Sequence, residues 1–233
     1  MWTKICGNTT LEDAQLAVTH GADAVGFIFA EGPRRVTPEA VGKITGQLPR
    51  TIEKYGVFVD ADFAAIVETV RVAGLTGVQL HAPDGSGIAE RLRQHYAGRA
   101  GRFYILQVLH YAGDAEEFAA QLRRLRTNAS IDAVLLDSRT ATQQGGTGIA
   151  FDWSGAREVL AREAHPLRLI VAGGLRPENV QQAIATLRPW GVDVSSGVEA
   201  RPGRKDPQRV AAFMQAARMA ATKMEKADAA ART

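Results

Sequence analysis

Short apolar runs alternate with longer amphipathic stretches along the whole chain. The apolar runs number eight and cover Trp2–Cys6, Ala24–Phe29, Glu53–Val59, Gly77–Leu80, Phe103–Val108, Ala133–Asp137, Arg168–Ala172 and Gly191–Val194. Runs of this kind are typical of buried parallel strands, and a helix between two of them returns the chain to the start of the next strand. Eight such repeats predict an α/β fold, a single (β/α)8 TIM barrel with eight parallel strands and the helices outside. An open doubly wound sheet is the alternative, although no GxGxxG motif follows the first run.

Capping signals indicate where several helices begin. Thr9-Thr10-Leu11-Glu12 has the form of a capping box, and Thr37-Pro38 and Asp206-Pro207 each place a capping residue before a proline. Pro177-Glu178 is a further expected helix start. These positions fall between the predicted strands, as a barrel requires.

The chain shows no linker or shift in composition that would divide it into two domains. We therefore expect one barrel domain over residues 1–215. Residues 216–233 turn to Ala, Lys, Met and Arg, and they are expected to form the end of the last helix and a frayed C-terminal tail.

Composition and charge narrow the classes of function. No apolar run approaches the roughly 20 residues that span a bilayer, and the N-terminus lacks a signal peptide, so no membrane partner and a cytoplasmic location are expected. A net charge of +3 with 6% aromatic residues argues against a nucleic-acid partner, but it would favour an anionic small molecule. The short basic cluster Arg201 to Lys205 is interpreted as solvated surface. The single cysteine excludes an intrachain disulfide and disfavours structural zinc, and the absence of an uncovered apolar face favours a monomer.

Polar residues collect where the predicted strands end, which is the end of a parallel barrel that carries the active site. Asp137 shares one face of its strand with Ala133 and Leu135, so it is expected to point inward. Gln79 and His81 alternate with apolar neighbours in the same way and would face the barrel axis.

Strand one carries the only sulfur at these ends. Lys4 and Cys6 share a face, so the Lys4 ammonium could lie below the sulfur and favour its thiolate. The alternatives stay open: Cys6 as a small buried apolar residue, Lys4 as filling of the barrel floor, and His81 as a hydrogen-bonded structural histidine.

Three glycine-rich segments follow strands six, seven and eight. Gly173 and Gly174 follow the seventh strand, and Ser195-Ser196-Gly197 follows the eighth, which is where barrels of this class commonly bind a phosphate. Gly145, Gly146 and Gly148 lie beyond Asp137 and would let the backbone approach an anion closely. A surface turn is the alternative for this third segment.

Motifs along nearly the whole chain resemble those of the phosphoribosylanthranilate isomerase family of tryptophan biosynthesis. They are Lys4-Ile5-Cys6-Gly7, Gly26-Phe27-Ile28-Phe29, Pro33-Arg34, Gly56-Val57-Phe58-Val59, Val78-Gln79-Leu80-His81, Leu135-Leu136-Asp137-Ser138, Gly145-Gly146-Thr147-Gly148, Ala172-Gly173-Gly174-Leu175 and Gly191-Val192-Asp193-Val194-Ser195-Ser196-Gly197-Val198-Glu199. Only the tail past about Met214 lies outside the resemblance.

The resemblance implies an Amadori rearrangement of N-(5-phosphoribosyl)anthranilate that uses no cofactor and no metal. It implies that Asp137 is the general acid, protonated near neutral pH, and that Cys6 is the general base, acting as a thiolate. Arg34 would bind the anthranilate carboxylate, with Arg35 on the surface, although the sequence leaves an exchange of these two open. The expected substrate-binding residues are Arg34, Gln79, His81, Gly146, Gly148, Gly173, Gly174, Ser195, Ser196 and Gly197.

Three rival functions fit the sequence less well. A phosphoribosyl isomerase of histidine biosynthesis would use two aspartates, whereas strand one ends here in Cys6. Indoleglycerol phosphate synthase would need lysine and glutamate at strand ends, and Lys4 is too deep. A barrel that binds a sugar phosphate without catalysis would be expected to keep the glycines and lose Cys6 or Asp137, and both are present.

Overall fold

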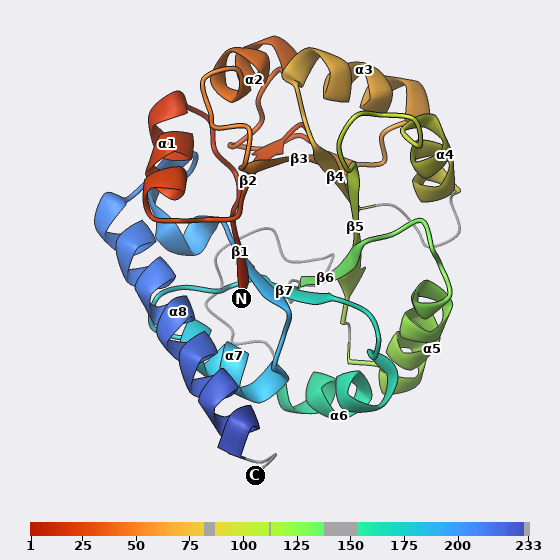
Figure 1. Cartoon of the computed structure of the whole chain (residues 1–233), viewed down its shortest axis with the longest axis vertical. Helices are drawn as coiled ribbons and strands as arrows, with labels where there is room; N and C mark the ends of the chain where they lie inside the picture. The colour runs from red at the N-terminus through yellow and green to blue at the C-terminus, as the bar shows by residue number, and fades with distance from the viewer. Residues whose placement is uncertain (82–86, 112, 138–152, 231–233) are drawn as a thin grey trace.

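The computed structural model describes residues 1–81, 87–111, 113–137 and 153–230, and its centre is a closed barrel of parallel strands. Each strand pairs with the next in the sequence and β8 pairs with β1, which confirms the predicted (β/α)8 fold (Figure 1). The strands are β1 (Trp2–Ile5), β2 (Ala24–Ile28), β3 (Glu53–Val59), β4 (Gly77–His81), β5 (Tyr104–His110), β6 (Ala133–Asp137), β7 (Leu169–Ala172) and β8 (Gly191–Val194).

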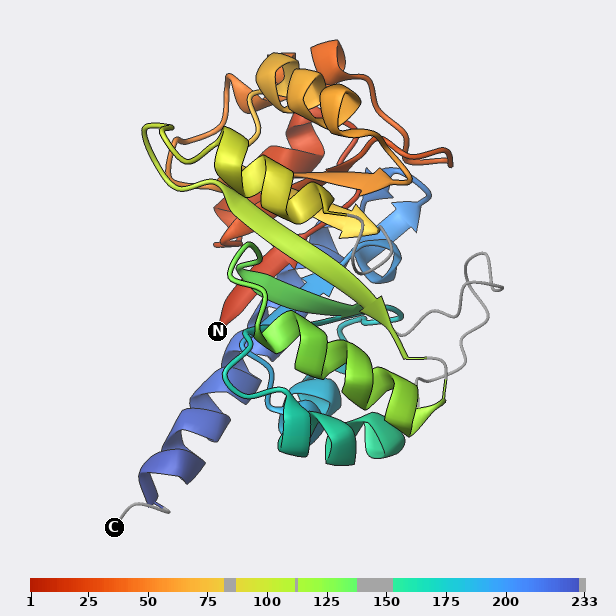
Figure 2. The ribbon, with the colours of Figure 1, turned by 90° about the vertical axis from the view of Figure 1, so that its right-hand side faces the viewer.

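Helices surround the barrel on all sides (Figures 1 and 2). They are α1 (Leu11–Thr19), α2 (Pro38–Thr45), α3 (Phe63–Ala73), α4 (Ile88–His95), α5 (Ala115–Arg126), α6 (Trp153–Glu163), α7 (Val180–Leu187) and α8 (Pro207–Ala230). None of the helices in the described residues is both long enough and apolar enough to cross a bilayer.

The helix starts follow the capping signals with two corrections. The Thr37 side chain accepts a hydrogen bond from the Ala40 N–H, and Asp206 accepts two from the first turn of α8, as expected. The cap of α1 is Thr10 rather than Thr9, because its hydroxyl accepts from the Asp13 N–H at 3.3 Å. Helix α7 begins at Val180, because the chain at Pro177 still forms a turn.

Period-two alternation sorts the strand residues into two buried layers. On β6, Ala133 and Leu135 belong to the cluster inside the barrel, while Val134 and Leu136 pack between the strands and the helices. Asp137 continues the inner row, as predicted, because side chains two residues apart lie on the same face.

The chain after β8 forms an additional element before the last helix. A short 3-10 turn (Ser196–Val198) leads into an antiparallel ribbon of β9 (Glu199–Arg201) and β10 (Arg204–Lys205). Helix α8 then buries Ala216, Ala217, Ala220 and Ala221 against the rest of the molecule. Packing therefore continues past the boundary expected at residue 215, and α8 reaches Ala230 with its last turns projecting away from the barrel (Figure 2).

Candidate active site

A pocket of about 610 Å³, including its open mouth, lies at the C-terminal ends of the strands. It brings together residues from the ends of β1, β4, β6, β7 and β8 and from the loop after β2. The predicted residues that line it are Cys6, Arg34, Gln79, His81, Asp137, Gly173, Gly174, Ser195 and Ser196. Side chains distant in the sequence thus share one cavity, as the strand-end argument requires.

Of the predicted residues that the structure describes, only Gly197 does not line this pocket. Gly146 and Gly148 belong to residues 138–152 and lie outside the described residues. Gly197 lies in the 3-10 turn, where an added Cβ would come within 1.8 Å of the Leu175 carbonyl oxygen. Its role in the structure is therefore to let the loops after β7 and β8 pack backbone against backbone.

The loops after β7 and β8 have the features of an anion site. Gly173 and Gly174 take positive φ angles of 76° and 63°, which glycine adopts without strain. The Ser195 Oγ is buried and has no hydrogen-bond partner within the described ranges. The turn that follows starts at Ser196, so peptide N–H groups and a hydroxyl lie together at the pocket wall.

Cys6 lies directly after β1 and is only 4% exposed. An added Cβ on Gly26 would lie 2.6 Å from the Cys6 sulfur, so β2 packs tightly against it. Burial raises the pKa of the Cys6 thiol, and Lys4 opposes this change while Asp193 adds to it. The predicted influence of Lys4 thus has the expected direction, but burial outweighs it.

Lys4 lies beneath the Cys6 sulfur in a buried network of polar side chains. Its Nζ donates to the Gln79 Oε1 at 2.9 Å and pairs with the Asp193 Oδ2 at 2.9 Å. Burial lowers the pKa of Lys4, but the opposite charges of Asp193 and Cys6 outweigh burial and the net change is upward. Lys4 therefore stays an ammonium that faces the thiol.

Asp193 lines the pocket but was not predicted as a site residue. Its Oδ1 is buried and lacks a partner among the residues described. The sequence did hold a signal, because Asp193 is the one charged residue of an apolar strand. The structure makes it the register partner of Lys4.

The β4 residues confirm the predicted alternation. Val78 and Leu80 pack toward the helices, while Gln79 bonds Lys4 inside the barrel. The Gln79 amide nitrogen lies 3.1 Å from the His81 Nε2, so His81 is hydrogen-bonded as well as pocket-lining.

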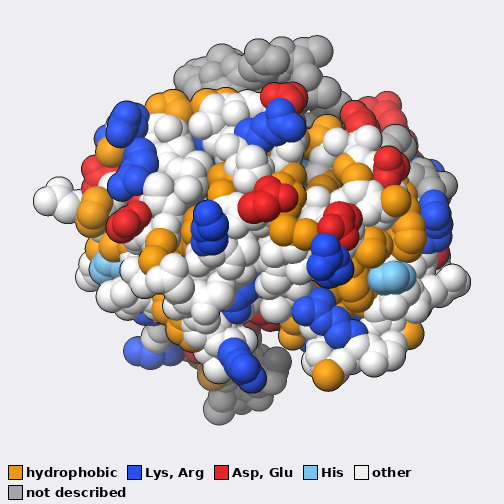
Figure 3. Space-filling view, turned by 90° about the horizontal axis from the view of Figure 1, so that it is seen from above, with side chains coloured by type: hydrophobic (Ala, Val, Ile, Leu, Met, Phe, Trp, Pro, Cys, Tyr) orange, Lys and Arg blue, Asp and Glu red, His pale blue; other side chains and the backbone are white. Residues whose placement is uncertain are grey.

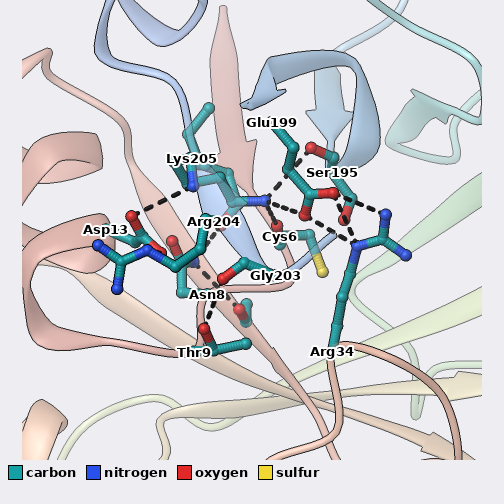
Figure 4. Close-up of polar contacts among 12 residues, drawn as sticks. Cys6, Asn8, Thr9, Asp13, Arg34, Ser195, Glu199, Gly203, Arg204 and Lys205 are labelled. Carbon is teal, nitrogen blue, oxygen red and sulfur yellow. Dashed lines mark hydrogen bonds and ion pairs between the residues drawn. The ribbon is translucent and has the colours of Figure 1, made fainter. Parts of the chain in front are cut away.

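Arg34 and Arg35 occupy different environments. Arg34 lines the pocket, and its Nε and Nη2 atoms donate to the Glu199 carboxylate at 2.6 to 3.1 Å (Figure 4). Arg35 has a side chain that is 54% exposed and pairs with Glu31. The arginine facing the pocket is therefore Arg34, as the resemblance implied.

Lys205 corrects the interpretation of residues 201–205 as solvated surface. Its side chain is fully buried, and its Nζ donates to the backbone oxygens of Cys6 (2.6 Å) and Ser195 (3.2 Å) and to Glu199 (3.0 Å). The sequence did not reveal this, because only the ribbon pairing places Lys205 opposite Glu199. The sequence feature that could have indicated this burial is the pair of opposite charges, Glu199 and Lys205, on either side of a Pro-Gly turn.

Comparison with known proteins agrees with this geometry. Residues 3–216 match the family model described as N-(5'phosphoribosyl)anthranilate (PRA) isomerase. A relative of that name from Citrifermentans bemidjiense is 41% identical, covering 89% of this chain and 92% of the relative.

Solved structures of the same family share the fold. The phosphoribosyl anthranilate isomerase of Thermotoga maritima matches with a TM-score of 0.80 and 33% identity, covering 94% of this chain and 98% of that one. A second structure, in complex with reduced 1-(o-carboxyphenylamino)-1-deoxyribulose 5-phosphate, matches with a TM-score of 0.77 and 32% identity over the same shares. The chain belongs to the phosphoribosylanthranilate isomerase family, the aldose–ketose isomerases of tryptophan biosynthesis.

Proposed function

We propose that this chain converts N-(5-phospho-β-D-ribosyl)anthranilate into 1-(2-carboxyphenylamino)-1-deoxy-D-ribulose 5-phosphate, with Asp137 as general acid and Cys6 as general base. The observation that carries the proposal is that Cys6 and Asp137 line the same pocket as the loops after β7 and β8. An acid, a base and an anion site in one cavity are what an isomerisation of a phosphorylated sugar needs.

The reaction follows from placing the substrate phosphate at these loops and its carboxylate at Arg34. Asp137 donates a proton to the furanose ring oxygen, and the ring opens to a Schiff base. The Cys6 thiolate removes the C2′ proton to give an enolamine, which tautomerises to the ketone. The ring opens when the nitrogen lone pair forms the C=N bond and the C1′–O bond breaks, and the other changes are proton transfers, so the sequence requires neither a metal nor a redox cofactor.

Lys4 stabilises the base in this mechanism. Its ammonium faces the Cys6 sulfur and favours the thiolate against the effect of burial. A general acid or base of this kind contributes about 10²- to 10⁴-fold to the rate.

The test follows the fluorescence decay of phosphoribosylanthranilate with wild type, Cys6→Ser and Asp137→Asn. Each variant is expected to lower kcat by at least about 100-fold while KM changes little, because each group acts on protons and not on binding. Wild type with no turnover but with binding of the substrate would favour the non-catalytic sugar-phosphate barrel. Full turnover in either variant would show that the assigned acid or base is wrong.

The chain is further proposed to act as a monomer in the cytoplasm. The large apolar side chains that are exposed among the described residues are Val59 at the end of β3, Trp190 in the loop before β8 and Met219 on α8. Charges of both signs are interspersed on the face shown in Figure 3. Sedimentation equilibrium should give a single species of about 25.0 kDa, and a dimer mass would contradict the proposal.

A further inference from the structure

Three charged side chains form one connected cluster beside the pocket, and we call Arg34, Glu199 and Lys205 the charge cluster. Glu199 accepts from Arg34 through both oxygens and from Lys205 through Oε1 at 3.0 Å (Figure 4). The three side chains are 19%, 3% and 0% exposed, respectively. Charge-assisted bonds in such buried surroundings hold their partners in fixed orientations.

The ribbon that carries Glu199 and Lys205 is tied to the rest of the site. Lys205 donates to the carbonyl oxygens of Cys6 and Ser195, which lie at the ends of β1 and β8. The ribbon turn is held by a hydrogen bond of 2.5 Å from the Thr9 hydroxyl to the Gly203 carbonyl oxygen. Glu199 therefore sits on a support that is fixed relative to the proposed base and the proposed anion site.

The orientation of the Arg34 guanidinium follows from this support. Glu199 occupies the edge formed by Nε and Nη2, which leaves to a second carboxylate the edge formed by Nη1 and Nη2. A guanidinium binds carboxylates in the plane of its N–H groups, so fixing one edge fixes the direction of the other. Arg34 lines the pocket, and its Nη1 atom donates no hydrogen bond to any of the described residues.

Lys205 keeps the cluster attractive to an anion. Arg34 and Glu199 alone would be neutral, but Lys205 adds a second positive charge, so the cluster carries a net charge of +1. Burial by itself would raise the pKa of Glu199, yet the hydrogen bonds and charges of Arg34 and Lys205 lower it overall. Glu199 thus remains ionised. Burial lowers the pKa of Lys205, and the charge and hydrogen bond of Glu199 oppose this change.

We propose that Glu199 is a positioning residue for substrate recognition: supported by Lys205, it orients the Arg34 guanidinium so that the Nη1 and Nη2 edge meets the carboxylate of the substrate's aromatic amine. This inference rests on the proposed function, which assigns that carboxylate to Arg34. The opposite model, in which Glu199 competes with the substrate for Arg34, predicts the opposite change in affinity.

The test compares two ligands that differ only in the carboxylate. One is reduced 1-(o-carboxyphenylamino)-1-deoxyribulose 5-phosphate, and the other is the same reduced compound made from aniline. Titration calorimetry of Glu199→Gln should show about a 10-fold loss of affinity for the carboxylated ligand, because an oriented charge-assisted contact is lost. Affinity for the aniline compound should stay unchanged, which also reports an intact pocket.

The chain offers a matched control in the neighbouring pair. Glu31→Gln breaks the exposed Arg35–Glu31 ion pair by the same chemical change, and it should alter the affinity for neither ligand. In steady-state kinetics Glu199→Gln should raise KM and leave kcat nearly unchanged. Because Glu199 acts through Arg34, the effects of Glu199→Gln and Arg34→Ala should not add in the double variant.

Several outcomes would overturn the inference. Tighter binding of the carboxylated ligand by Glu199→Gln would establish competition, and equal weakening of both ligands would establish a merely structural role. If Arg34→Ala loses the preference for the carboxylated ligand but Glu199→Gln keeps it, only this inference fails. If Arg34→Ala keeps the preference, the assignment of Arg34 in the proposed function fails instead. Should Glu199→Gln not fold, Glu199→Asp, which keeps the charge but shortens its reach, must show the same selective loss.

Discussion

Both ends of the barrel interior contain buried polar groups, but these groups have hydrogen-bond partners at one end and lack some of them at the other. At the N-terminal end of the strands, Glu53 accepts hydrogen bonds from the Trp2 indole at 3.1 Å and the Tyr55 hydroxyl at 2.8 Å. At the C-terminal end, Asp193 Oδ1 and Ser195 Oγ are buried without a partner in the part of the chain that the structure describes. Buried polar atoms are normally paired, so unpaired ones facing a pocket indicate a place for a ligand.

The difference separates a stabilising end from a reactive end. Trp2 stacks on Trp190 and meets Tyr55 edge to face, so its end of the barrel is closed by aromatic packing. The opposite end keeps its charges at a pocket. Substitutions at the first end should therefore change stability, and substitutions at the second should change chemistry.

The largest effect is expected from Cys6→Ala at the reactive end. Loss of the proposed base should lower kcat by about 1,000-fold, whereas removing one small buried side chain should lower the free energy of unfolding by only about 1 kcal/mol. Stopped assays and urea unfolding of the same preparation measure both quantities. A large loss of stability together with residual turnover near that of wild type would reverse the comparison.

Trp2→Ala should have the opposite signature at the stabilising end. Trp2 is 8% exposed, and removing a buried indole costs about 3–5 kcal/mol of stability. Its kcat/KM below the unfolding transition should stay within a few-fold of wild type. Trp2→Phe, which keeps a ring, serves as the milder control, and a loss of kcat in that folded variant would count against the separation.

Arg34→Ala and Arg35→Ala test whether two neighbours in the sequence make very different contributions to KM. Loss of the pocket-facing Arg34 should raise KM by about 10- to 100-fold, the value of a charge-assisted hydrogen bond. Loss of the exposed Arg35 should leave KM unchanged, because a surface ion pair contributes little. The reverse result would assign the carboxylate to Arg35.

These residues also show which features of the site can be predicted from the sequence and which cannot. The inward orientation of Asp137 and Gln79 can be predicted, because it follows from alternation within one strand. The sequence could not reveal the burial of Lys205, because it depends on a ribbon that pairs Lys205 with Glu199 and brings its Nζ to the Cys6 carbonyl oxygen. The pKa of Cys6 was similarly out of reach, since it depends on how tightly β2 and the whole pocket wall exclude water.

The pH dependence of kcat/KM tests the role of Cys6 at the reactive end, because two substitutions should shift the pKa of Cys6 in opposite directions. A base must be deprotonated, so kcat/KM should rise as the pH increases through the pKa of Cys6, which burial raises above that of an ordinary thiol. Lys4→Met removes a charge that lowers this pKa and should move the rise to higher pH. Asp193→Asn removes a charge that raises it and should move the rise to lower pH. Shifts in the same direction would show that another group controls the limb.

The smallest effect is expected from Glu53→Gln at the stabilising end. Burial raises the pKa of Glu53, although the Tyr55 and Trp2 hydrogen bonds oppose this change. Because the folded pKa exceeds the unfolded one, the stability that protonated Glu53 contributes is present below about pH 4.3 and is lost as pH rises through the folded value. The amide of the variant would keep an oxygen for Trp2 and Tyr55 without that loss, so the thermal stability of Glu53→Gln relative to wild type should improve between about pH 4 and pH 7 while kcat stays constant. Thermal melts across this range measure the trend. If the stability of Glu53→Gln relative to wild type instead falls as the pH rises, the folded protein favours the ionised Glu53 carboxylate.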